Sequence, residues 1–192
     1  MNIILASGSP RRKELLEMLG IKDLMIIPPK REEIFPENLS PSDTVGYLSL
    51  MKALEIAVSR GLREDDTIIG ADTIVWYDNR IFGKPHDAAE AVEMLRTLRG
   101  HTHEVYTGVS VISGCTALSE CEVSRVHFRD ISDREIAAYV ATGEPLDKAG
   151  SYGAQGRGAL FVRGIDGDFF NVMGLPLCRL DAMLKKVGYE LI

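Results

Sequence analysis

Residues 2–20 read NIILASGSPRRKELLEMLG, and this stretch predicts a strand, a tight turn and a helix in succession. The apolar run 2–6 is typical of a buried strand, and the leucines of segment 12–19 recur at helical spacing before Gly20. Between them lie small residues followed by two arginines, so backbone N–H groups and charged guanidinium groups are expected at one place. We interpret 7–12 as a phosphate-binding turn, although a plain strand–helix turn with surface arginines fits the same residues. It is not a P-loop, because the GxxxxGK[ST] spacing is missing.

Beyond this stretch, strand-like and helical segments alternate, which predicts an α/β fold. Ser40-Pro41-Ser42-Asp43 is a strong helix start, because serine can cap and proline suits the first helical position. The glycine-rich stretch 143–158 shows no periodicity and is expected to be a functional loop rather than core. The remaining expected strands are 24–27, 67–71, 73–77, 103–112, 118–128 and 160–165, with a break around Asp72 and a hairpin turn at Asp78-Asn79 that leads into Ile81-Phe82. The helix that starts at Ser40 is expected to run to about Ser59. Three further helices are expected: one over 87–100, one that begins at a Ser132/Glu135 capping box and stops at Gly143, and one over 175–187.

The composition is that of an ordinary globular chain, with 192 residues, 45% hydrophobic and 26% charged. This length favours a single domain over 1–192. The net charge of −6 argues against a nucleic-acid partner, because nucleic-acid-binding domains usually carry a basic excess. We expect no membrane span, because no apolar run approaches the ~18 residues of a membrane helix. No secretory signal is recognisable and the three cysteines lack zinc or disulfide spacing, so a reduced cytoplasmic setting is expected.

Five polar residues outside the first turn are candidates for chemistry. Asp72 follows one apolar run and precedes another, which is unfavourable for a charge unless it pairs with a partner, a metal or a positioned water. Glu33 could join Asp72 as a carboxylate ligand of Mg²⁺, although a loop glutamate is more often solvated. Lys52 and Lys84 could reach a phosphate as point charges, or lie on the surface. Gln155 could read a base edge by paired hydrogen bonds, or belong to an ordinary flexible loop.

Taken in order, these segments resemble the Maf family, the septum-formation-inhibitor-like nucleotide pyrophosphatases. The resemblance covers nearly the whole chain and rests on the motifs LASGSPRRKELLEMLG, GADTIVW, FGKP, GHTHEVYTGV, YVATGEPLDKAGSYGAQG and NVMGLPL. It implies a mixed twisted α/β sheet with flanking helices, related to the inosine-triphosphate pyrophosphatases, with two lobes around a central cleft. It also suggests a homodimer, the commonest symmetric assembly.

The resemblance implies cleavage of a nucleoside triphosphate between its α- and β-phosphates, giving the monophosphate and pyrophosphate with Mg²⁺ or Mn²⁺. Asp72 matches the family's general base, the proton acceptor. The family's other polar cleft positions are matched by Ser7, Arg12, Glu33, Lys52 and Lys84. A bound cation lowers the basicity of a carboxylate, so Asp72 cannot easily serve as both metal ligand and free base, and either role stays open.

Three positions resemble the family's dTTP/UTP branch: Arg11, Thr73 and Gln155. The 7-methyl-GTP branch would show a tryptophan, a glutamine and a glutamate there. We therefore expect Arg12 to serve every substrate and Arg11 to influence base preference. Two alternatives stay open: a broader activity on modified pyrimidine triphosphates, and a nucleotide-binding regulator of septation that acts through a protein partner.

Overall fold

The computed structural model describes residues 2–21, 23–31, 34, 36, 38–61, 63 and 65–192. Its strands are β1 (Asn2–Ala6), β2 (Met25–Ile26), β3 (Asp66–Tyr77), β4 (Arg80–Phe82), β5 (Thr102–Ser113), β6 (Thr116–Phe128) and β7 (Val162–Asp166). Its helices are α1 (Pro10–Met18), α2 (Pro41–Arg60), α3 (Ala88–Leu98), α4 (Asp133–Val140), α5 (Phe169–Met173) and α6 (Leu177–Lys186), with the 3₁₀ helices η1 (Glu144–Asp147), η2 (Ala149–Ser151) and η3 (Arg157–Phe161).

The strands form one mixed sheet. Hydrogen-bonded neighbours follow the order β2-β1-β3-β5-β6-β7, and β4 pairs with β3. Pairing is parallel between β1 and both of its neighbours, and antiparallel between β3 and β4 and between β6 and β7. The predicted mixed α/β sheet with flanking helices is therefore confirmed.

The chain divides into two compact units, each assembled from separated segments. Unit 1 consists of Met1–Asp72, Thr107–Glu122 and Gly174–Ile192, and unit 2 consists of Thr73–Tyr106 and Val123–Met173. Strands β3, β5 and β6 each have residues in both units. A single domain over 1–192 and a central cleft stay predictions.

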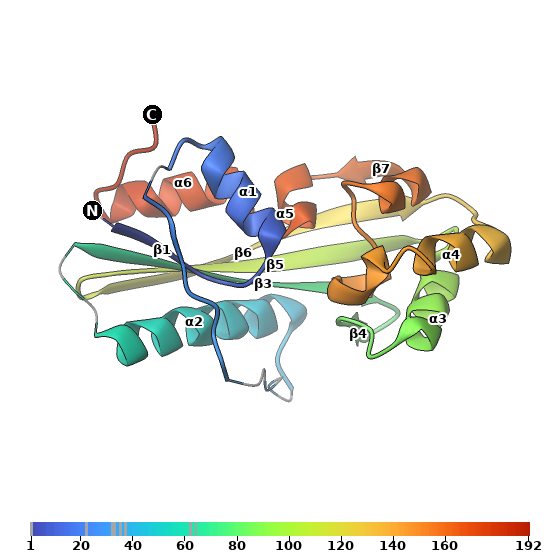
Figure 1. Cartoon of the computed structure of the whole chain (residues 1–192), viewed down its shortest axis with the longest axis horizontal. Coiled ribbons are helices and arrows are strands. Elements are labelled where there is room, and N and C mark those ends of the chain that lie inside the picture. The colour runs from blue at the N-terminus through green and yellow to red at the C-terminus, as the bar shows by residue number, and fades with distance from the viewer. Residues whose placement is uncertain are drawn as a thin grey trace. The chain divides into compact units, whose positions relative to one another are not determined.

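In unit 1, strand β1 lies between β2 and β3 and is parallel to both. Figure 1 shows α2 on one side of these strands and α1 and α6 on the other. Helices on both faces bury residues 3–6, which explains why this part of the strand is continuously apolar rather than alternating. The core between α2 and the strands contains Ile4, Ala6, Ala53, Ile56, Ile68 and Ile112.

Helix α2 approaches the strands unusually closely because two strand residues are glycines. A Cβ built on Gly70 would lie 2.2 Å from the Ser49 carbonyl oxygen, and one built on Gly108 would lie 2.1 Å from the Val45 carbonyl oxygen. Side chains at these points would collide with helix backbone, which cannot move aside as a flexible side chain can. The two glycines therefore set the position of α2 on β3 and β5.

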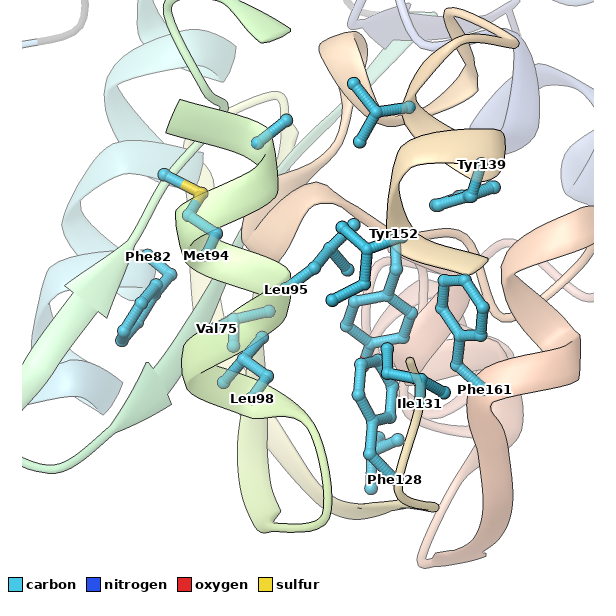
Figure 2. Packing of buried hydrophobic residues seen from close by; sticks show 14 of the residues in the cluster. Val75, Phe82, Met94, Leu95, Leu98, Phe128, Ile131, Tyr139, Tyr152 and Phe161 are labelled. Carbon is cyan, nitrogen blue, oxygen red and sulfur yellow. The ribbon is translucent and has the colours of Figure 1, made fainter. Parts of the chain in front are cut away.

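Unit 2 has its own core, shown in Figure 2, in which aromatic rings from several segments meet edge to face. His103 is fully buried there, with its Nε2 atom 2.8 Å from the Tyr152 hydroxyl and its ring edge-on to Phe128. Burial, with a smaller contribution from the charge of His127, lowers the pKa of His103 from 6.5 to about 3. The imidazole is therefore neutral at physiological pH.

Two predicted helix starts and the hairpin turn are confirmed. The Ser40 hydroxyl accepts the Asp43 N–H at 3.1 Å, and Ser132 and Glu135 form a complete capping box. Asp78 and Asn79 have positive φ angles of 49° and 56°, as a tight hairpin turn between β3 and β4 requires. Within the described residues, none of the helices combines the length and the apolar character that a membrane crossing needs.

Two predictions are wrong. Strand β3 runs unbroken through Asp72, because the carboxylate has a partner that lies 20 residues earlier in the chain. The stretch 143–158 is not excluded from the core: its Tyr152 is only 5% exposed and packs with Phe128. In addition, the helix expected over 175–187 is α6, and a separate short α5 precedes it.

Replacing Gly108 with alanine should destabilise the protein by about 1–3 kcal/mol or more, because the new methyl group would overlap the Val45 carbonyl. Urea unfolding measures the effect. Gly83→Ala is the control, since its Cβ would meet nothing within 4 Å and its stability should be unchanged or slightly raised. Equal stabilities of the two variants would contradict the close approach of α2.

His103 should make stability fall as the pH is lowered from 6.5 toward 3. In this window the unfolded state binds a proton that the folded state does not, so the free energy of unfolding decreases by up to about 1.4 kcal/mol per pH unit from this group. Denaturation of His103→Gln between pH 7 and 4.5 should therefore show a shallower dependence than the parent protein. The exposed His86→Gln serves as control, and identical slopes for all three proteins would refute the assignment.

Candidate active site

The predicted turn and Asp72 lie at the same edge of the sheet in unit 1. Ser7 follows the last residue of β1, which pairs with Gly70, and Asp72 comes two residues after Gly70 on β3. The chain after β2 reaches the same edge, since a Cβ built on Gly8 would lie 3.5 Å from the Pro28 side chain. Carboxyl ends of parallel strands are where open α/β sheets bind ligands. The fold thus gathers the turn and the acid where a ligand is expected.

Asp72 forms a buried ion pair with Lys52. Their side chains are 7% and 12% exposed, and the Lys52 ammonium donates to the Asp72 Oδ1 atom. The pairing follows from two periodicities. Asp72 lies two residues after Gly70 on one strand face, and Lys52 lies three residues after Ser49 on one helix face. Because Gly70 lies against the Ser49 backbone, the acid and the lysine are brought together.

The Ser7 and Arg12 side chains also meet. Arg12 is 8% exposed, and its Nη1 atom donates to the Ser7 hydroxyl at 3.0 Å. Its Nε atom donates to the Gly174 carbonyl at 2.7 Å, so the guanidinium ties the start of α1 to the segment before α6. These two bonds use two of the five N–H groups of a guanidinium. Arg12 therefore has a structural role that the sequence did not predict.

Helix α1 begins inside the predicted 7–12 turn. Pro10 occupies the first helical position, and the Ser9 side chain makes no capping hydrogen bond. The positive end of the helix dipole accordingly faces the turn without a side-chain oxygen of Ser9 to offset it. Arg11, the next residue, is half-buried. This environment suits an anion such as a phosphate group.

Three predicted site residues belong to unit 2. Thr73 is half-buried on β3, Lys84 is exposed just after β4, and Gln155 is half-buried in the stretch 143–158. Within that unit, the Gly150 N–H donates to the Gly83 carbonyl, which links the segment of Lys84 to the stretch of Gln155.

The predicted metal ligands are only partly described. Glu33 lies outside the described residues, whereas Asp72 supplies a carboxylate at the ligand-binding edge. Within the described ranges, no group of three or more histidine, cysteine, aspartate or glutamate side chains gathers closely enough to form a metal cage. A single carboxylate still fits Mg²⁺, which typically takes one or two carboxylates together with substrate phosphates and water.

Sequence reasoning missed Glu55. Its carboxylate accepts the N–H groups of Lys30 at 2.7 Å and Arg31 at 3.3 Å, and it lies almost one helical turn after Lys52 on α2. Helix α2 thus holds both Asp72 and the chain that follows β2. No local pattern marks Glu55, because an exposed helix glutamate usually has only solvent around it.

The fold resembles that of a solved HAM1 protein from Coxiella burnetii. The two structures superpose with a TM-score of 0.50 at 16% sequence identity, over 97% of this chain and 99% of the other. At this identity the likeness is one of fold alone, and it agrees with the mixed sheet described above.

Sequence comparison is more specific. The family model described as Maf-like protein matches residues 2–187. A Bacillus cereus (strain AH820) protein named dTTP/UTP pyrophosphatase is 50% identical over 188 residues, covering 98% of this chain and 96% of its own length. A Bacillus cytotoxicus protein of the same name is 51% identical over 183 residues, covering 95% and 94%. The chain belongs to the Maf family.

Removing the Lys52 charge should leave Asp72 buried without its lysine. We expect Lys52→Met to lower the free energy of unfolding by about 3–5 kcal/mol, the range for breaking a buried pair. The loss should shrink in an Asp72→Asn background, as a double-mutant cycle by denaturant unfolding measures. Lys13→Met breaks the exposed pair with Glu17 and should change stability by less than about 1 kcal/mol. Additive losses at Lys52 and Asp72 would count against the ion pair.

Proposed function

We propose that this chain is a nucleoside triphosphate pyrophosphatase that converts dTTP and UTP to the monophosphate and pyrophosphate. The observation that carries the proposal is the Lys52–Asp72 pair, buried at the sheet edge that also holds the Ser7–Arg12 turn. This arrangement combines a carboxylate that can take a proton with cations that suit a polyphosphate. The names of the relatives, at about half identity over nearly the full length, support the same reaction.

In the proposed reaction, Asp72 accepts a proton from a water molecule that attacks the α-phosphorus. A bond forms between that oxygen and the α-phosphorus, the bond to the bridging α–β oxygen breaks, and pyrophosphate leaves. Lys52 holds the Asp72 carboxylate in place before substrate binds and, with Lys84, offsets charge on the leaving pyrophosphate. Ser7, Arg12 and the first-turn N–H groups of α1 hold phosphate oxygens.

A divalent cation, Mg²⁺ or Mn²⁺, completes the proposed site. Maf-family nucleotide pyrophosphatases are generally metal-dependent. Glu33 would hold the ion, with Asp72 as a second ligand in the alternative in which this carboxylate is not the base; the bound ion would neutralise phosphate charge. Lys52 donates to one oxygen of Asp72, so an ion held by Asp72 would share this carboxylate with the lysine.

Base preference is assigned to Arg11, Thr73 and Gln155. These residue types match the dTTP/UTP branch, and modified pyrimidine triphosphates are further proposed substrates. We also propose a homodimer in the cytoplasm.

The reaction type is tested by product identification. The purified protein is incubated with Mg²⁺ or Mn²⁺ and dTTP, UTP, 5-methyl-UTP, pseudo-UTP or 7-methyl-GTP. Pyrophosphate and the monophosphate should appear with dTTP and UTP. Release of orthophosphate would refute the bond assignment, and a preference for 7-methyl-GTP would refute the proposed base preference.

Asp72→Asn should lower turnover of dTTP by roughly 10²-fold or more, the scale for loss of a general base, while nucleotide binding is largely kept. Steady-state kinetics and equilibrium binding measure the two effects. Asp78→Asn is a matched control in the exposed hairpin turn, where asparagine adopts the same positive φ without strain. Unchanged turnover in Asp72→Asn would remove the catalytic role, and a division phenotype that survives in this variant would support the septation-regulator alternative.

A further inference from the structure

The stretch that carries Gln155 is folded around one carboxylate. Glu144 accepts hydrogen bonds from the backbone N–H of Arg157 at 3.2 Å and of Gly158 at 3.4 Å. It also accepts a hydrogen bond from the Tyr139 hydroxyl at 3.0 Å. An acidic side chain at the start of the stretch thus holds backbone 13 and 14 residues later.

The Tyr139 hydroxyl extends this network to the other side of Gln155. It accepts the Gly153 N–H at 3.1 Å while it donates to Glu144. Tyr139 comes from α4, is 4% exposed, and packs edge-on against Phe161 with ring centroids 5.0 Å apart; both rings appear in Figure 2. Burial raises the pKa of Tyr139, which keeps the phenol protonated and able to donate.

Two positions require glycine because the backbone there lies directly against Glu144 and Tyr139. Gly156 has a φ of +98°, and a Cβ built on it would lie 2.9 Å from the Glu144 Oε1 atom. A Cβ on Gly158 would lie 2.7 Å from the Tyr139 hydroxyl and 2.6 Å from the Gly153 carbonyl oxygen. Gly156 and Gly158 of the YGAQGRG segment are therefore explained by close contact with Glu144 and Tyr139, and not by flexibility.

These contacts bracket Gln155, with Gly153 held on one side and Arg157 and Gly158 on the other. An amide that distinguishes bases must be held within about 0.5 Å of its working position, and supporting residues normally provide that precision. We propose that Tyr139 and Glu144 are positioning residues that fix segment 153–158 and thereby determine base selectivity through Gln155. This inference rests on the proposed function, in which Gln155 contacts the base.

The test compares Tyr139→Phe with Tyr77→Phe, a matched removal of a phenol hydroxyl in the same unit. In Tyr139→Phe, the ratio of kcat/KM for UTP to that for CTP should fall about 3- to 10-fold, the size of one hydrogen bond. The loss should appear in KM for UTP, with kcat changed less than about twofold, because the Tyr139 hydroxyl bonds to Glu144 and Gly153 and to none of the proposed catalytic residues. Tyr77→Phe should keep the parent ratio. Glu144→Gln should lower the ratio further, since it weakens three contacts at once.

Amide hydrogen exchange gives a readout that needs no substrate. Exchange in a peptide spanning 152–159 should accelerate at least tenfold in Tyr139→Phe and stay unchanged in Tyr77→Phe. If the parent protein cleaves UTP and Tyr139→Phe keeps both the UTP/CTP ratio and the exchange protection, the positioning role is refuted and the proposed function stands. Equal losses for UTP and CTP would also refute it, since they indicate general destabilisation. If the parent protein cleaves neither UTP nor dTTP, the proposed function fails and the selectivity role fails with it.

Discussion

The backbone of α2 lies against β3 and β5 with no side chain between them at Gly70 and Gly108, and the site depends on this contact. A helix seated on side chains could rotate or slide as those side chains repack, whereas a helix seated on backbone has little such freedom. Lys52 therefore meets Asp72 as a consequence of packing, and Glu55 on the same helix holds the chain after β2. One helix orders both the acid and a neighbouring segment of the binding edge.

At the same edge of the sheet, the Lys52–Asp72 pair stabilises a buried negative charge, and the Ser7–Arg12 turn suits the negative charges of a bound phosphate. Asp72 is nearly inaccessible to solvent, so its ionised form relies on the lysine for stabilisation. A polyphosphate that binds at the turn carries several negative charges, which the carboxylate of Asp72 repels. The N-terminal end of α1 and the nearby arginines reduce this repulsion. Arg12 contributes by holding the Ser7 hydroxyl and the Gly174 carbonyl, which joins the two ends of unit 1 at the site.

How far the sequence predicts this structure depends on the distance over which each interaction acts. Ser40, the Ser132/Glu135 box and the Asp78-Asn79 turn were predictable because their partners lie within a few residues. The break at Asp72 was wrongly predicted, since the compensating lysine comes from another element. The burial of Tyr152 was missed for the same reason, because His103 lies 49 residues away. The residue types were enough to predict the chemistry of the site, whereas the contacts between its residues became visible only in the structure.

The interleaving of the two units has a consequence for how the chain acquires its structure. The polypeptide passes from one unit to the other at residues 72/73, 106/107, 122/123 and 173/174. During synthesis, unit 1 cannot be completed until α6 has emerged, which happens after every residue of unit 2 has been made. Helix α1 must wait for a partner far downstream, because Arg12 donates to the Gly174 carbonyl 162 residues later. The entropy of closing so long a loop slows folding. Because each unit is made of separated segments, neither corresponds to one continuous stretch of sequence that a single exchange could replace.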